Sequence, residues 1–327
     1  MQDPTIAPVP PLSWYRVLRG ELGDRFFSFL TGGMAVLVLV LLAGAAFSML
    51  WGGRLAFQTF GLRFIYSGEW DAVNKQFGAL IPIYGTVVSA LIALVIAVPV
   101  SFGIAFCLTE VAPRFLQAPV SIAIELLAAI PSIIYGMWGL FVFAPFMANY
   151  IEPWLNDHFT GVPLLGDLFT GPPIGIGMLP AGIILGVMVL PFITAVMWSV
   201  FRAVPPSVKE AAVALGATKW EVLTKVTLPY TKSAVIGAIF LGLGRALGET
   251  MAVTFVLGNA HDFSKSLLMP GNSIAAAIAN EFTEADTPIY LSSLIALGFL
   301  LFVVTIIVLA LARLLLFRLG RLEGARS

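Results

Sequence analysis

Long apolar segments alternate with short polar ones along almost the whole chain of 327 residues. A helix needs about 20 apolar residues to cross the roughly 30 Å of hydrocarbon in a bilayer. Six segments meet that length, near residues 27–50, 80–108, 120–147, 175–200, 233–258 and 289–316. The pattern therefore predicts an all-α membrane protein in which six transmembrane helices form one bundle.

The positive charges of the polar segments are distributed unevenly between the two sides of this predicted bundle. If both termini lie on one side, the segments on that side carry most of the Lys and Arg residues. The loops on the opposite side contain Arg54, Arg63, Lys75 and Lys265. Because Lys and Arg are enriched in loops that stay in the cytoplasm, we expect both termini to be cytoplasmic.

Hydrophobic residues make up 59% of the chain and charged residues 11%, whereas soluble domains carry about 25% charged residues. This composition excludes a water-soluble enzyme. The single cysteine, Cys107, lies within an apolar segment and cannot support a disulfide framework or a metal cluster. We expect His158 and His261 to be solvated side chains of the outer loops. We therefore expect no metal, no cofactor and no nucleic acid partner.

The loop at 201–232 differs from a simple connector, because it combines residues that favour helix with balanced charges and an internal glycine. Ser207 and Glu210 have the spacing of a capping box at a helix start. Gly216 suits the left-handed conformation that ends a helix. A second short helix is predicted to start near Thr218, with Glu221 again at the third position of a capping box. The loop is therefore expected to be a structured cytoplasmic element.

The same loop resembles the EAA loop of ABC importer permeases. The residues that carry this resemblance are Glu210-Ala211-Ala212, Gly216 and Val226-Thr227-Leu228-Pro229. The family usually has Ile where this chain has Val226, which leaves the apolar contact possible. The resemblance implies that residues 205–229 dock in a cleft of a cytoplasmic ATPase through Glu210, Ala211, Ala212, Gly216, Leu228 and Pro229. The chain has no Gly-x-x-x-x-Gly-Lys-Ser/Thr run, so we expect ATP hydrolysis in a separate subunit and no enzymatic activity here.

Arg245 lies in the fifth apolar segment, about 12 residues or roughly 18 Å from its cytoplasmic end. A charge at that depth costs about 2.5–3.5 kcal/mol and indicates a functional residue. The planar guanidinium of Arg245 offers paired N–H donors that suit two oxygens of an oxyanion such as phosphate. Glu249 follows four residues later on the same predicted face. We hypothesise that Glu249 holds Arg245 when the site is empty; the alternative is a permanent ion pair that fixes helix register.

Four further motifs resemble the PstC family of bacterial phosphate importer permeases. They are residues 126–139 (LLAAIPSIIYGMWG), 242–254 (GLGRALGETMAVT), 269–274 (MPGNSI) and 279–282 (ANEF). The resemblance extends from about residue 60 to the C-terminus. It implies a MetI-like type I ABC importer permease core with an extra N-terminal helix, and a phosphate pathway that includes Arg245, Glu249, Ser132 and Thr250.

The resemblance also implies the partners and the location of the chain. It implies a heterodimer with a PstA-like permease, two PstB-like ATPase subunits and a PstS-like periplasmic phosphate-binding protein, in the bacterial inner membrane. ATP binding would then move the coupling loops and open the permease outward. The corresponding division of the chain is a cytoplasmic segment (1–26), a first transmembrane helix with a periplasmic loop (27–78), a permease core (79–318) and a cytoplasmic tail (319–327).

Two other functions remain open on the residues alone. One arginine does not distinguish phosphate from another tetrahedral oxyanion, such as sulfate or molybdate. An ATP-independent anion carrier could also use Arg245 and Glu249, although the loop at 205–229 argues against it. A role in reporting phosphate status to cytoplasmic partners would be an addition to transport.

Overall fold

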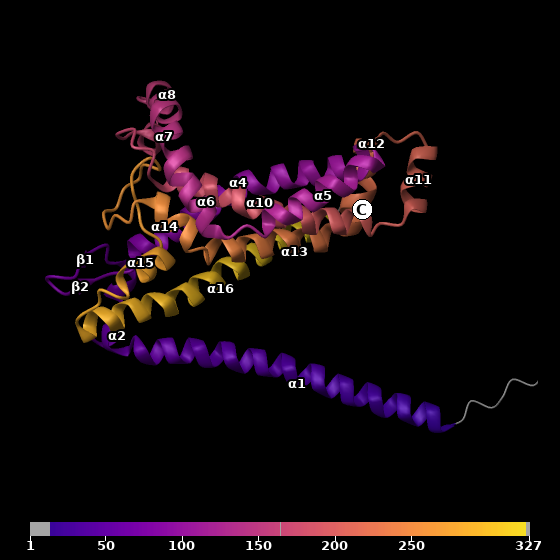
Figure 1. Cartoon of the computed structure of the whole chain (residues 1–327), viewed down its shortest axis with the longest axis horizontal. Coiled ribbons are helices and arrows are strands. Elements are labelled where there is room, and N and C mark those ends of the chain that lie inside the picture. Colours follow the sequence, from indigo (N-terminus) through magenta and orange to yellow (C-terminus); the bar gives the residue numbers. More distant parts are fainter. Residues whose placement is uncertain (1–13, 164, 325–327) are drawn as a thin grey trace, which may run out of the picture. The chain divides into compact units, whose positions relative to one another are not determined.

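A computed structural model describes residues 14–163 and 165–324 of the chain, in two compact units (Figure 1). The first unit, residues 1–51, is represented by the long helix α1 (Trp14–Gly52), whose apolar part is Gly23–Gly52. Residues 1–13 of the predicted cytoplasmic segment and 325–327 of the predicted tail lie outside the described residues.

The second unit, residues 52–327, contains the remaining elements. In chain order they are α2 (Arg54–Phe60), α3 (Arg63–Tyr66), β1 (Trp70–Asp71), β2 (Gln76–Phe77), α4 (Leu80–Phe106), α5 (Arg114–Ala128), α6 (Ser132–Trp138), α7 (Ala144–Phe146), α8 (Glu152–Phe159), α9 (Leu165–Phe169), α10 (Met178–Arg202), α11 (Pro206–Ala214), α12 (Lys219–Val222), α13 (Leu228–Leu247), α14 (Met251–Leu257), α15 (Ile274–Glu281) and α16 (Pro288–Gly324). Four π-helical turns, Cys107–Val111, Gly139–Phe143, Met147–Ile151 and Leu223–Thr227, connect helical pieces. The two strands form an antiparallel hairpin.

Six helical segments among the described residues are long and apolar enough to cross a membrane, as the sequence predicts. They are Gly23–Gly52, Leu80–Val111, Ser132–Phe159, Met178–Arg202, Lys219–Leu247 and Pro288–Leu314. The bounds of the third segment differ from the prediction of 120–147. Residues 120–128 belong to a separate helix, α5, and the span begins at Ser132. The helix breaks before Pro131, because a proline disfavours helical backbone in the residue that precedes it.

The core of the second unit is the packing of α10 against α4. Small residues make this contact close: a Cβ atom on Gly182 would lie 2.6 Å from Ile92, and one on Gly186 would lie 3.2 Å from the Ala93 carbonyl oxygen. Glycines at such positions let the backbones of membrane helices approach each other. On α10, Leu185 and Val189 are fully buried. The pair α4–α10 is thus the closely packed centre of the bundle.

The second unit has two distinct ends (Figure 1). The short helices α11 and α12 lie at one end, and α8, α15 and the β1–β2 hairpin lie at the other. We call these the α11 end and the α15 end. The ends differ in their packing, since α11 has no buried residue, whereas Ile274 and Ala277 of α15 are fully buried.

Candidate functional site

The fifth predicted span is interrupted where its charged residues lie. Helix α13 ends at Leu247, and α14 starts at Met251. The carboxylate of Glu249 lies in this interruption, and its Oε1 atom accepts a hydrogen bond from the Ala252 backbone N–H at 3.3 Å. The expectation of one continuous helix over 233–258 is therefore wrong. The interruption is only three residues long and has apolar segments on both sides, so hydropathy averaged over a window does not reveal it.

Arg245 occupies the last turn of α13 and is exposed on the surface of the single chain. Its Cζ atom lies 5.8 Å from the ring centroid of Phe192 on α10, which is the geometry of a cation–π contact. Among the described residues, no ion pair joins Arg245 to Glu249. The pairing expected from four-residue spacing is absent because the helix ends between the two residues.

The other two candidate pathway residues, Ser132 and Thr250, stand at the starts of α6 and α14, and both are half-buried. These two helices pack closely, because a Cβ atom on Gly136 would lie only 2.9 Å from the Met251 carbonyl oxygen. The structure thus brings together the starts of two helices, α6 and α14, each of which follows an interruption of helical structure.

Tyr135 connects the two sides of the first break. Its hydroxyl donates a hydrogen bond to the Leu127 carbonyl oxygen at 2.9 Å, across the break between α5 and α6. Because α6 packs against α14, the breaks before these two helices lie in one region of the molecule, and Arg245 lies two residues before the end of α13, at the second break.

A surface hollow of about 380 Å³ lies beside Phe192. It is lined by Glu125, Ala128, Phe192, Ala195, Val196, Ser199 and Val200. Glu125 is exposed on α5. Phe192 could not be singled out from the sequence, because nothing in an apolar span distinguishes one aromatic side chain from the others.

The α11 end contains the loop that resembles an EAA loop. Helix α11 starts with Pro205 at the N-cap position and Pro206 in the first turn, and no side chain caps it. The capping box predicted for Ser207 and Glu210 is therefore wrong; proline suits the first helical position because its fixed φ is already helical. Gly216 has the predicted left-handed backbone, with a φ of +90°.

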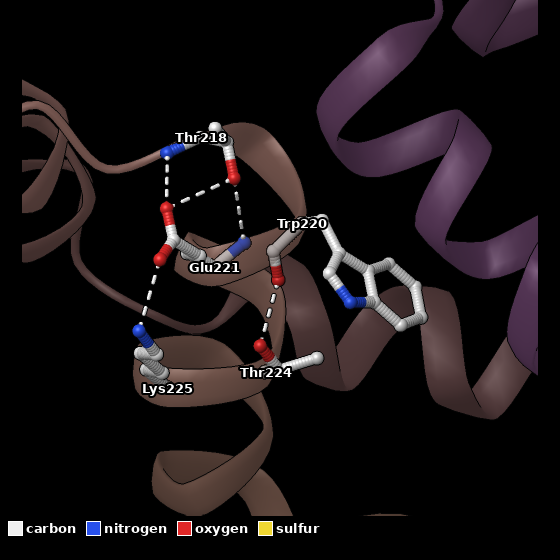
Figure 2. A network of polar contacts seen from close by, with 5 residues as sticks. All are labelled: Thr218, Trp220, Glu221, Thr224 and Lys225. Atoms are coloured by element: carbon white, nitrogen blue, oxygen red, sulfur yellow. Dashed lines mark hydrogen bonds and ion pairs between the residues drawn. The ribbon is translucent and has the colours of Figure 1, made fainter.

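The second capping box, at the start of α12, is confirmed (Figure 2). The Glu221 backbone N–H donates to the Thr218 hydroxyl at 3.3 Å, and the Thr218 N–H donates to the Glu221 carboxylate at 3.0 Å. Lys225 extends the network through an ion pair of 2.9 Å with Glu221. These contacts fix the geometry of a short helix that has few buried side chains.

The candidate coupling residues are divided between a surface and the bundle. Glu210, Ala211, Gly216 and Pro229 are exposed, and Ala212 is half-buried. Leu228 instead packs against the hydrophobic core at the start of α13. Two large apolar side chains join the exposed set, since Leu215 is 91% and Trp220 57% exposed. An apolar surface of this kind, on short helices, is typical of a docking site.

The α15 end contains a polar cluster built around Glu281. Its Oε2 atom accepts hydrogen bonds from Trp70 Nε1 at 2.7 Å and from the Tyr290 hydroxyl at 2.6 Å. His261 Nε2 lies 3.0 Å from Glu281 Oε1 and its ring stacks on Trp70. The expectation that His261 is a solvated side chain is therefore wrong.

The cluster sets the charge state of Glu281. Burial alone would raise the pKa of this carboxyl, but the hydrogen bonds from His261, Tyr290 and Trp70 and the charge of His261 bring the pKa below its ordinary value. The ionised carboxylate therefore holds together the β1–β2 hairpin, the loop after α14, α15 and α16.

Comparison with known proteins is consistent with this arrangement. The family model described as "Binding-protein-dependent transport system inner membrane component" matches residues 97–321. A protein of Xylella fastidiosa named "Phosphate transport system permease protein PstC" is 62% identical over 94% of this chain and 95% of its own length. A Mesorhizobium japonicum protein of the same name is 52% identical over 94% of each chain.

Among solved structures, a bacterial alginate ABC transporter in complex with a pentasaccharide-bound periplasmic protein has a chain with a similar fold. The TM-score is 0.56 at 18% identity, over 89% of this chain and 94% of that one. This likeness shows the fold alone. Together with the family model and the close relatives, it places the six spans in a permease fold. The chain belongs to the family of binding-protein-dependent transport system inner membrane components, and within it to the PstC permeases.

Proposed function

We propose that this chain is the permease subunit of an ATP-driven phosphate importer and forms half of its translocation pathway. The observation that carries this function is Arg245, an arginine on an open face of the bundle beside two helix breaks. The 62% identity to a phosphate permease supports phosphate as the transported oxyanion. An arginine can bind two phosphate oxygens at once and stays charged at physiological pH.

The residues near Arg245 complete the proposed substrate contacts. Ser132 and Thr250 supply hydroxyl groups at the starts of α6 and α14. Glu249 holds the start of α14 through Ala252 and places a negative charge near the pathway. This charge opposes tight anion binding, so phosphate can leave Arg245 after the helices move.

The α11 end is the proposed contact with the ATPase. Ala211, Ala212 and Gly216 are small residues that allow close docking, Glu210 adds a charge beside them, and the exposed Leu215 adds apolar area. Leu228 and Pro229 connect this surface to α13, which carries Arg245. The proposed ATPase is a separate PstB-like subunit, present in two copies.

We assign the remaining proposed partners to the α15 end and to the exposed face that carries Arg245. A PstA-like permease covers the face that carries Arg245, and a PstS-like binding protein docks at the α15 end. The α11 end and both termini are then cytoplasmic, in the bacterial inner membrane. This topology keeps the proposed division of the chain into 1–26, 27–78, 79–318 and 319–327.

The test is transport by the assembled importer in proteoliposomes. Phosphate-loaded binding protein should stimulate ATP hydrolysis and phosphate accumulation. Arg245→Ala should abolish accumulation while all subunits still co-purify, because the charged contact is lost and the fold is not. Arg202→Ala is the matched control: Arg202 is also exposed and lies 4.8 Å over an α10 aromatic ring, that of Trp198, and should retain transport.

Three outcomes would contradict the proposal. Normal uptake by Arg245→Ala would remove the substrate contact. Equal competition by sulfate or molybdate would identify a different or broader oxyanion importer. Uptake that does not require ATP would indicate a carrier.

A further inference from the structure

Glu110 and Lys209 form an ion pair at the α11 end, although they lie 99 residues apart in the sequence. The Lys209 Nζ atom is 2.6 Å from the Glu110 carboxylate, and only 16% of the Lys209 side chain and 14% of the Glu110 side chain are exposed. Lys209 also donates to the Phe201 carbonyl oxygen at 3.2 Å. One ammonium group thus connects α11 to the ends of α4 and α10.

Helix α11 has little other attachment to the bundle. None of its residues is buried, and Val208 and Val213 are 42% and 56% exposed. Figure 1 shows α11 standing away from the ends of the long helices. A hollow of about 460 Å³ lies beside the ion pair, and it is lined by Glu110, Lys209, Glu210, Val213, Ala214, Lys219 and Val222. Apolar packing therefore does not hold α11 against the bundle. The Glu110–Lys209 ion pair connects the two instead.

The surroundings of the pair favour a stiff connection. A hydrogen bond between two ionised groups is shorter and stronger than one between neutral groups. Low exposure also reduces screening by salt, which weakens most surface ion pairs. Glu110 lies in the π-helical turn Cys107–Val111 that ends the α4 segment, and such turns occur frequently at functional sites.

We propose that the Glu110–Lys209 pair transmits movement of α11 to the α4–α10 pair during transport. This inference rests on the proposed function, in which an ATPase docks on α11. A force on α11 passes through Lys209 to the ends of both helices, and α10 carries Phe192, which contacts Arg245. The closely packed α4–α10 pair moves as one body, so a displacement at its end reaches the pathway.

A second contact runs parallel to the ion pair. The rings of Trp220 on α12 and Phe106 on α4 meet edge to face with centroids 5.6 Å apart. Loss of the ion pair should therefore weaken coupling and leave some of it. Lys209 and Glu110 are positioning residues, since neither touches the proposed substrate.

The experiment uses the assembled importer in proteoliposomes and measures phosphate accumulated per ATP hydrolysed. Glu110→Gln and Lys209→Met should each lower this ratio about two- to thirtyfold, the range for mutations along coupling networks. Both variants should still assemble with the ATPase. Arg63→Met is the matched control, because it breaks an exposed ion pair of 3.5 Å with Glu69 and should leave the ratio unchanged.

A reversible cross-link separates transmission from a merely structural effect. In a Cys107→Ser background, Glu110→Cys combined with Lys209→Cys should show the lowered ratio. A bis-methanethiosulfonate reagent of similar length to the ion pair should raise the ratio, and reductant should lower it again. An unchanged ratio in both single variants, or a cross-link without effect, would overturn the inference while ATP-driven uptake by the wild type stands. Absence of ATP-driven uptake by the wild type would overturn the proposed function and this inference with it.

Discussion

The Arg245 guanidinium lies over the ring of Phe192, with 5.8 Å between the Cζ atom and the ring centroid. The two residues come from α13 and α10, so the contact connects the helix that ends at the break with the helix at the centre of the bundle. The ring restricts where the guanidinium can lie before an anion arrives.

Phe192→Leu should weaken phosphate uptake by removing the aromatic face and keeping an apolar side chain. A cation–π contact at an exposed site is worth about 0.5–1 kcal/mol, which corresponds to about a two- to fivefold change. The concentration of phosphate-loaded binding protein at half-maximal uptake should rise accordingly. Phe192→Tyr retains the ring and should retain most of the uptake; equal behaviour of both variants would contradict a role for the ring.

Gly136→Ala should impair uptake, because its Cβ atom would lie 2.9 Å from the Met251 carbonyl oxygen and push α6 away from α14. Contacts of that length force neighbouring atoms to shift, and added volume in a packed core costs about 1–3 kcal/mol. Gly237→Ala is the control, since nothing lies within 4 Å of the added atom. Thermal unfolding of both variants, together with uptake, tests the prediction, which fails if they behave alike.

Gly216→Ala should reduce coupling to ATP hydrolysis without a steric clash. The backbone at Gly216 has a φ of +90°, and nothing lies within 4 Å of an added Cβ atom, so the cost is conformational, about 1–2 kcal/mol. Gly216→Asn should lose less, because asparagine is enriched in this conformation. The amount of phosphate accumulated per ATP hydrolysed measures the coupling of both variants. An asparagine variant as impaired as the alanine variant would show that backbone strain is not the cause.

Glu281 should make the folded state sensitive to acid. Its pKa is below the ordinary value in the folded protein, so its stabilising contribution is fully present above the unfolded pKa of about 4.3 and is lost as the pH falls through the lower folded value. Glu281→Gln should lower Tm at pH 7 and flatten its dependence on acid. Glu284→Gln, at an exposed neighbour, should resemble the wild type. A Glu281→Gln curve parallel to the wild type would contradict the prediction.

Hydropathy was sufficient to predict six spans, but it did not reveal the helix breaks at 129–131 and 248–250. Pro131 marks the first break, yet Pro99 and Pro191 lie inside continuous helices. A proline in an apolar run therefore indicates a break only when tertiary packing can satisfy the free backbone groups, and packing is not visible in the sequence.

The local features of the coupling loop were easier to predict than its attachments. The Thr218–Glu221 capping box and the left-handed Gly216 depend on residues within one turn. The Glu110–Lys209 pair and the contact of Arg245 with Phe192 join residues that are distant in the sequence. No spacing rule relates such residues, so their roles appeared only in the fold.

The interruption at 248–250 determines how the bundle can bend. A continuous helix over residues 228–257 would tilt as one rigid body. A movement at its start would then displace its other end as well. Here α13 ends two residues after Arg245, and α14 is a separate helix that packs against α6. A bend at residues 248–250 lets the Arg245 guanidinium change its orientation while α14 stays packed against α6.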